Sequence, residues 1–182
     1  MRKAVLIIIG MMLLTSVSMA MDIKIEIKGH YFNPSNQDFK DIYGGGFMYG
    51  GEAALGIPGN FDFFLAAAFL SQTGELTFSG EETEINLIPI RAGVKYLVHL
   101  TESVDFYLGG GISYYLYEEI NPIGEVSDSG LGYMGTAGIN VFLSENFFID
   151  VFGSYSSCKV QPDEFEVDIG GLEAGCGLGI RF

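Results

Sequence analysis

The sequence contains no tryptophan, only two histidines and two cysteines, and few basic residues. Nine lysines and arginines stand against 23 aspartates and glutamates, which gives a net charge of −14. A nucleic-acid-binding domain needs a basic surface, so this balance excludes that class of protein. The few histidines and cysteines form no cluster with the spacing of a zinc site. We therefore expect no catalytic, cofactor or metal site.

Long apolar runs are also scarce, and the one at the N-terminus has a separate explanation. Arg2 and Lys3 precede an apolar run over residues 4–14, and the small residues Ser18 and Ala20 follow it. This order is typical of a secretory signal peptide cleaved after Ala20. The run is shorter than the ~20 residues of a membrane-spanning helix. We predict a signal peptide over residues 1–20 and one mature domain over residues 21–182.

What the sequence does contain is alternation, most clearly over residues 172–182. The even positions there are apolar, whereas the odd positions are glycine, Glu173 and Arg181. A period of two is typical of a β-strand. Such an apolar strand would aggregate at the edge of a soluble sheet, but in a closed transmembrane barrel its apolar face meets lipid. Leu178, Ile180 and Phe182 also resemble the C-terminal assembly signal of bacterial outer-membrane barrels.

Alternation of this kind defines eight segments along the chain. They cover residues 23–31, 47–57, 61–70, 84–98, 104–117, 131–141, 147–156 and about 167–182. The apolar positions change parity at Pro89, where we expect a β-bulge because proline cannot donate to a strand ladder. They change parity again at Gly170 and Gly171.

The connections between these segments alternate in length. Residues 58–60, 99–103 and 142–146 form short turns, while residues 32–46, 71–83, 118–130 and 157–166 form longer loops. Short turns at one end and longer loops outside the cell are the layout of bacterial barrels. The layout places two aromatic belts on the lipid-facing surface, at Tyr31, Tyr49, Tyr114, Tyr133 and Tyr155 and at Phe61, Tyr96, Phe106, Phe147 and Phe182. We predict an all-β protein: an eight-stranded antiparallel up-and-down transmembrane β-barrel, preceded by a cleaved signal peptide.

In architecture the chain resembles the small OmpA/OmpX-type eight-stranded barrels. Residues 31–35 and 39–44 resemble the opening of a poorly characterised outer-membrane β-barrel domain family, and residues 88–96 and 121–124 resemble further parts of it. The resemblance implies residence in the outer membrane of a Gram-negative bacterium. The partners it implies are the barrel assembly machinery, outer-membrane lipid and lipopolysaccharide. It implies no activity.

By parity, charged residues of both signs point into the barrel. An eight-stranded barrel has an interior just wide enough for side chains, and buried charges need partners. We therefore expect an interior filled by an ion-pair network. Its predicted members are Lys24, Glu26, Lys28, Glu52, Arg91, Lys95, Asp105, Asp150, Glu173 and Arg181, with Asp62 on the same face. The alternative is a narrow channel lined by Glu52, Arg91 and Lys95.

His30 is the one histidine expected to point inward, near the outer rim. Ser71 and Ser79 lie in the next loop, so a lipid-modifying enzyme that uses His30 is a second alternative. No nucleophile motif supports it. Cys158 and Cys176 fall on opposite parities of their strands, so we expect two free thiols and no disulfide.

The predicted outer loops hold more than half of the acidic residues, most densely at residues 81–84, 118–119 and 163–166. We expect a solvated surface, with weak divalent-cation binding that bridges to lipopolysaccharide phosphates as the sharper hypothesis. Apolar residues in the same loops could form a partner surface: Leu76, Phe78, Ile120, Ile123, Val126 and Phe165. The sequence thus favours a structural or surface-interaction protein, not an enzyme, and it does not identify the extracellular partner.

Overall fold

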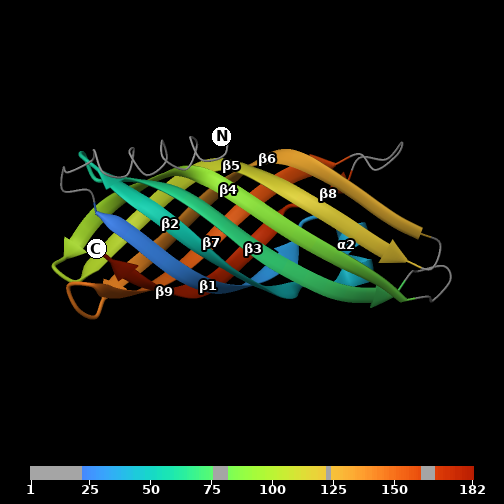
Figure 1. Cartoon of the computed structure of the whole chain (residues 1–182), viewed down its shortest axis with the longest axis horizontal. Coiled ribbons are helices and arrows are strands. Elements are labelled where there is room, and N and C mark those ends of the chain that lie inside the picture. The colour runs from blue at the N-terminus through green and yellow to red at the C-terminus, as the bar shows by residue number, and fades with distance from the viewer. Residues whose placement is uncertain (1–21, 76–81, 122–123, 161–166) are drawn as a thin grey trace, which may run out of the picture.

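A computed structural model describes residues 22–75, 82–121, 124–160 and 167–182. They form a closed antiparallel barrel with tight turns at one end and the longer connections at the other (Figure 1). From β1 to β7 each strand pairs with its neighbours in the chain, β8 and β9 both pair with β7, and β9 closes the barrel by pairing with β1. The strands are β1 (Ile23–Pro34), β2 (Gly46–Ile57), β3 (Phe61–Glu75), β4 (Glu82–Thr101), β5 (Val104–Asn121), β6 (Gly124–Phe142), β7 (Phe147–Val160), β8 (Val167–Asp168) and β9 (Gly171–Arg181). The predicted eight-stranded up-and-down barrel is confirmed, with its eighth strand interrupted into β8 and β9.

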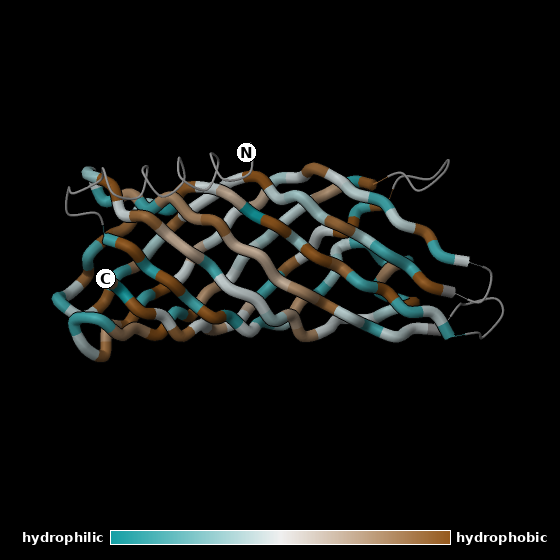
Figure 2. Tube along the Cα trace, in the orientation of Figure 1, coloured by the Kyte–Doolittle hydropathy of each residue, from teal (hydrophilic) through white to brown (hydrophobic). Residues whose placement is uncertain are grey.

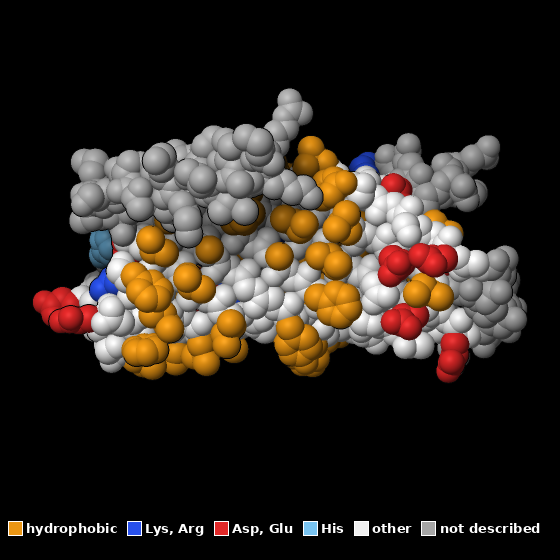
Figure 3. Space-filling view, in the orientation of Figure 1, with side chains coloured by type: hydrophobic (Ala, Val, Ile, Leu, Met, Phe, Trp, Pro, Cys, Tyr) orange, Lys and Arg blue, Asp and Glu red, His pale blue; other side chains and the backbone are white. Residues whose placement is uncertain are grey.

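The outer face of the barrel carries the apolar half of the alternating strands. Hydropathy alternates along the strands (Figure 2), and apolar side chains gather on the barrel wall that Figure 3 shows. All ten residues of the two predicted aromatic belts lie on this face, with exposed fractions from 36% for Phe106 to 69% for Phe182. An apolar band flanked by aromatic residues at both interfaces is typical of a barrel that spans a lipid bilayer. The inward positions of the same strands carry the buried polar and charged residues.

The expected bulge at Pro89 is wrong. The register between β3 and β4 is the same on both sides of it, with Ile90 opposite Ala67 and Leu87 opposite Leu70. The β4–β5 ladder also continues through Pro89, which lies opposite Tyr115. Odd-numbered residues of β4 therefore point inward along the described strand until the register shift near its periplasmic end.

The parity change at Gly170 and Gly171 has the same explanation. Asp168 lies opposite Lys159 and Leu172 lies opposite Tyr155, so β8 and β9 meet β7 in one register. The carboxylate of Asp168 accepts hydrogen bonds from the backbone N–H groups of Gly170, at 2.8 Å, and Cys158, at 3.0 Å. These bonds hold the interruption in place.

At both places the interior changes from polar to apolar while the backbone keeps its register. A cluster of buried residues, the outer core, occupies the lumen at the end with the longer connections. Its members are Phe32, Phe39, Tyr43, Met48, Ala68, Leu70, Ile85, Leu87, Tyr115, Tyr117, Cys158, Val160 and Ile169. The expectation of an interior filled throughout by ion pairs is therefore wrong for this end of the barrel, because packing there is apolar.

The segment after β1 contains a helix, α2 (Gln37–Tyr43), where the sequence predicted only a loop. The side chain of Asn36 accepts a hydrogen bond from the N–H of Phe39 at 2.9 Å, which caps the helix N-terminus. Phe39 and Tyr43 are buried in the outer core. The Tyr43 hydroxyl lies 3.2 Å from Thr83 Oγ1, and burial raises the pKa of the phenol, so it stays protonated. No described helix is long and apolar enough to cross a membrane.

Three predicted outer loops are shorter than expected because the strands continue into them. β3 reaches Glu75, β5 reaches Asn121 and β7 reaches Val160. The β7 extension supplies Cys158 and Val160 to the outer core, and the other two continue the ladders with β4 and β6.

Candidate functional site

The middle of the lumen contains a cluster of charged side chains from four strands. The Nζ atom of Lys28 lies 3.3 Å from Glu26, 2.9 Å from Glu52 and 3.0 Å from Asp150. Lys95 contacts the other carboxylate oxygen of Glu52. These five residues, the lysine cluster, come from β1, β2, β4 and β7 and are all largely buried. Two lysines therefore neutralise three carboxylates only in part.

A second group, the arginine cluster, lies around Glu173 on β9. Nη1 of Arg91 donates to Glu173 Oε2 at 2.9 Å, and Nη2 contacts Oε1. Ser154 Oγ donates to Glu173 at 3.3 Å, and His30 Nε2 lies 3.1 Å from the same carboxylate. Arg91 thus pairs with Glu173, while Glu52 and Lys95 pair with each other.

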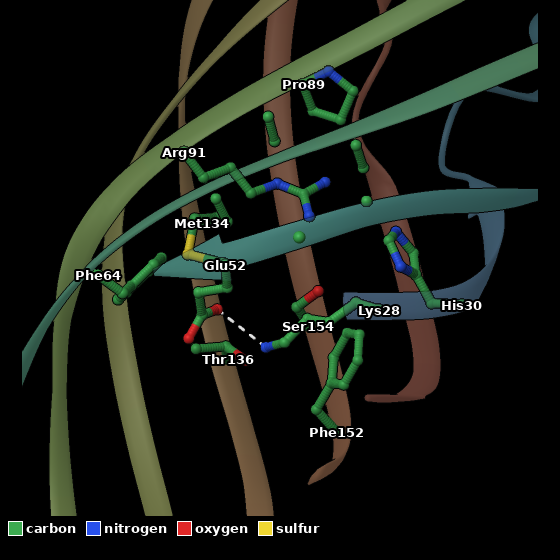
Figure 4. A pocket seen from close by; sticks show the side chains of 15 residues that line it. Lys28, His30, Glu52, Phe64, Pro89, Arg91, Met134, Thr136, Phe152 and Ser154 are labelled. Atoms are coloured by element: carbon green, nitrogen blue, oxygen red, sulfur yellow. Dashed lines mark hydrogen bonds and ion pairs between the residues drawn. The ribbon is translucent and has the colours of Figure 1, made fainter. Parts of the chain in front are cut away.

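A small cavity of about 30 Å³ lies between the two clusters. Arg91, His30, Ser154, Lys28 and Glu52 all border it (Figure 4). A cavity needs ~10–15 Å³ of free volume to hold one water molecule, so this one has room for water only. The interior therefore offers no room here for a lipid or a hydrated ion.

The remaining predicted members of the network lie toward the tight-turn end. Lys24 donates to Asp62 at 2.7 Å. Asp105 lies 2.6 Å from His99, and Nε of Arg181 donates to the backbone carbonyl of Glu145 at 3.2 Å. All these side chains except Glu145 border an open mouth of about 640 Å³. In the described structure, Asp105 and Arg181 have no ion pair with either cluster.

Sequence reasoning missed the tyrosines that complete these clusters. The hydroxyl of Tyr107 donates to Asp150 at 3.0 Å. The hydroxyl of Tyr115 lies 2.6 Å from Ser156 Oγ and accepts from Arg91 at 3.4 Å. The strict parity of β5 places both tyrosines on the inward face, so that parity was the available signal.

The contacts of His30 do not form a catalytic triad. In such a triad the histidine lies between the nucleophile and the carboxylate, because it must accept the nucleophile's proton. Here Glu173 lies between His30 and Ser154. His30 is only 3% exposed and Ser154 only 6%. Neither group can reach an acyl ester in the surrounding membrane in this arrangement.

The described part of the outer end carries acidic residues on the extended strands. Ser71 Oγ donates to Glu84 at 3.1 Å, and Asn86 donates to Glu118 at 3.4 Å. No group of three or more acidic, histidine or cysteine residues in the described ranges has the arrangement of a metal site. The predicted acidic run at residues 163–166 lies outside the described residues, as do Leu76, Phe78, Ile123 and Phe165 among the apolar candidates. Ile120 and Val126 are described, and both are exposed.

Comparison with known proteins identifies the family. The profile of the outer membrane protein beta-barrel domain family matches residues 10–182. The chain belongs to this family. It is accordingly a barrel of the Gram-negative outer membrane. No curated protein sequence matches the chain.

Solved structures agree on the fold of this outer-membrane barrel. OprG from Pseudomonas aeruginosa is 15% identical, with a TM-score of 0.68 over 90% of this chain and 96% of OprG. Neisserial surface protein A is 15% identical, with a TM-score of 0.66 over 89% of this chain and 97% of its own. Ail of Yersinia pestis, solved with the heparin analogue sucrose octasulfate, is 16% identical, with a TM-score of 0.59 over 90% of this chain and all of Ail.

The barrel's closing strand carries the predicted assembly-signal residues. Leu178, Ile180 and Phe182 all point outward and are exposed, at 60%, 39% and 69%. The two thiols are free, as predicted: Cys176 is exposed on the same face and Cys158 is buried in the outer core.

Proposed function

We propose that the chain is a structural and surface-interaction barrel and not an enzyme. The observation that carries this proposal is the filling of the described lumen. The lysine cluster, the arginine cluster and the outer core succeed one another along it, and the cavity between the two charged clusters is only about 30 Å³. Beyond the open mouth at the tight-turn end, the described lumen has no substrate-sized space, so the outer end and the lipid-facing wall remain as contact surfaces.

The partners that we propose follow from position and charge. Outer-membrane lipid and lipopolysaccharide surround the apolar wall, and the barrel assembly machinery receives the closing strand through Leu178, Ile180 and Phe182. The outer end is acidic, so it would repel a polyanion such as the heparin analogue bound to Ail. We infer that it contacts cationic groups or weakly bound divalent cations. The mature chain begins after Ala20 in this proposal.

The two alternatives have less support. A channel past Glu52, Arg91 and Lys95 would have to separate ion pairs and pass the outer core. A lipid-modifying site at His30 would need access that its burial does not provide. Planar-bilayer recordings of the purified barrel should show no steady conductance, and Glu52→Ala should not create one. Lipid A and phospholipid profiles should be the same in wild-type, deletion and His30→Ala strains; loss of one lipid species from both mutants would make the enzyme the better interpretation.

A binding experiment tests the surface role directly. Barrels in nanodiscs expose both ends, so binding to immobilised polylysine can be compared between two charge-matched variants. Glu82→Gln with Glu118→Gln changes the outer end, and Glu102→Gln with Glu145→Gln changes the periplasmic turns. We expect the outer variant to lose most of the binding and the periplasmic variant to keep it. Equal losses would mean that net charge alone causes the binding.

A further inference from the structure

The interior of the barrel contains one more carboxylate than it has permanent positive charges. The buried carboxylates are Glu26, Glu52, Asp62, Asp150 and Glu173, and the cations that contact them are Lys24, Lys28, Arg91 and Lys95. Asp105 is also buried, but it is left out of this balance because its partner His99 is 58% exposed and can supply a positive charge from the solvent side. An unbalanced buried charge is costly, and a protein commonly removes it by binding a proton.

Four of the five carboxylates are well matched. Glu52 contacts two lysines, and Asp150 contacts Lys28 and Tyr107. Asp62 has Lys24, and Glu173 has Arg91.

Glu26 is the poorly matched one. Its one ion pair among the described residues is with Lys28, at 3.3 Å, and Lys28 also serves Glu52 and Asp150. The atom in this contact is Oε2 of Glu26, which is buried and has no partner in hydrogen-bond geometry. This carboxyl group is therefore the one on which a proton would relieve most unfavourable energy.

The neighbouring strands reinforce this conclusion. Glu52 on β2 lies directly opposite Glu26 in the ladder, and like charges in such a pair destabilise a sheet. On the other side of β1, the residues of β9 nearest to this carboxyl group are glycines. Gly179 lies opposite Glu26, and Gly177 lies so close to Oε2 that an added Cβ would be 3.2 Å from it. Neither glycine brings a cation to the carboxyl group. The titratable groups around Glu26 in the lysine cluster are Lys28, Glu52, Lys95 and Asp150.

We propose that Glu26 is a buried proton-binding site, occupied by one proton at neutral pH. With the proton on Glu26, the five carboxylates carry four charges, which match the four cations. Protonation of His30 could balance the charge instead, but His30 lies against Glu173, which Arg91 already neutralises. When Glu26 ionises in alkaline solution, the lysine cluster has three negative charges against two positive ones.

The site links the stability of the barrel to pH with a defined sign. In the unfolded chain a glutamate in water loses its proton near pH ~4.3. The folded barrel retains the proton at higher pH, so it binds more protons than the unfolded chain in that range. Its stability therefore decreases as the pH rises, until Glu26 is ionised in the folded state as well.

Urea unfolding of the purified barrel in lipid vesicles between pH 5 and pH 9 tests this linkage. Against wild type, Glu26→Gln should have a similar midpoint at pH 5 and a clearly higher one at pH 9. Glu52→Gln, a buried and well-matched control, should be less stable than wild type at pH 5, where it leaves Lys95 without a carboxylate. The proposal is wrong if the wild-type and Glu26→Gln midpoints change in parallel with pH. If the urea midpoint loses its pH dependence in His30→Gln and keeps it in Glu26→Gln, the proton belongs to His30.

An infrared measurement is independent of stability. Wild type at pH 7 should show the C=O band of a protonated carboxylic acid, which disappears on alkaline titration. The band should persist in Glu102→Gln, which changes an exposed periplasmic turn, and be missing in Glu26→Gln. If Glu26→Gln does not fold, isotope-edited glutamate in the wild-type barrel decides the question, since the absence of a protonated glutamate at pH 7 would overturn the proposal.

Discussion

Arg91 on β4 and Glu173 on β9 form a two-point ion pair across the lumen, with Nη1 2.9 Å from Oε2, although 82 positions separate them in the sequence. Their side chains are 7% and 0% exposed. Both charges are thus removed from water, and each depends on the other for compensation.

Glu173→Ala should therefore destabilise the barrel by about 3–5 kcal/mol, because it leaves Arg91 buried and unpaired. Glu102→Ala in an exposed periplasmic turn is the control and should change stability by less than about 0.5 kcal/mol. The double variant Arg91→Met with Glu173→Met should recover much of the loss. Urea midpoints measured in vesicles give all three values, and a double variant as unstable as Glu173→Ala would contradict the compensation argument.

Glu52 should be more important for stability than an acid of the outer end. Glu52→Ala leaves Lys28 and Lys95 without a shared carboxylate, again at a cost of about 3–5 kcal/mol. Glu82→Ala removes an exposed carboxylate and should have little effect. Equal denaturant midpoints for the two variants would mean that Glu52 is solvated.

The lipid-facing wall predicts a depth-dependent effect of charge. Leu178→Arg places a cation within the apolar band and should cost up to about 2–4 kcal/mol. Ile120→Arg changes an exposed apolar residue of the β5 extension, beyond the outer belt, and should be tolerated. Deletion of Phe182 should lower the amount of folded barrel in the outer membrane. Immunoblots of heat-modifiable barrel in membrane fractions measure these effects, and normal levels of Leu178→Arg would refute the register.

The two cysteines should differ in reactivity. Cys158 is 1% exposed, and burial raises the pKa of its thiol to about 11, so little thiolate forms at pH 8. Cys176 lies on the outer face. An apolar maleimide should label wild type and Cys158→Ser once in detergent and leave Cys176→Ser unlabelled until urea is added. Rapid labelling of native Cys176→Ser would show that the outer core opens.

Helix α2 should depend on the outer core. Phe39→Ala removes a buried ring of this helix, a change that costs about 3–5 kcal/mol in a well-packed core. We expect faster hydrogen exchange of the α2 amides in Phe39→Ala, while the exposed variant Lys40→Ala leaves it unchanged. Unchanged exchange in Phe39→Ala would mean that the helix does not need this contact.

Much of the barrel was predictable because membrane and water impose a simple rule on a strand. Residues 172–182 alternate between lipid and lumen, so the sequence shows which of their side chains face outward. The same alternation in the other segments gave the strand count and both aromatic belts. Parity also selected Glu26, Lys28, Glu52, Lys95 and Asp150 as inward residues. Because the period is local, it can be read without knowing which strands meet across the lumen.

The assignment of every apolar strand residue to the lipid-facing side was wrong at the outer end of the lumen. Ile85, Leu87 and Ile169 are apolar and inward, because the outer end of the lumen is packed like the core of a soluble protein. The sequence alone could not distinguish this arrangement from a bulge at Pro89 or Gly170.

The sequence by itself therefore determined the barrel, its membrane-facing surface and the set of inward charges, since these depend on alternation along each strand. Only the tertiary structure decided that Arg91 pairs with Glu173, that Asp105 and Arg181 lie apart, and that Glu26 lacks a full partner. Partners across a lumen come from strands far apart in the chain. Their pairing depends on barrel closure, strand register and side-chain reach, none of which a period of two encodes.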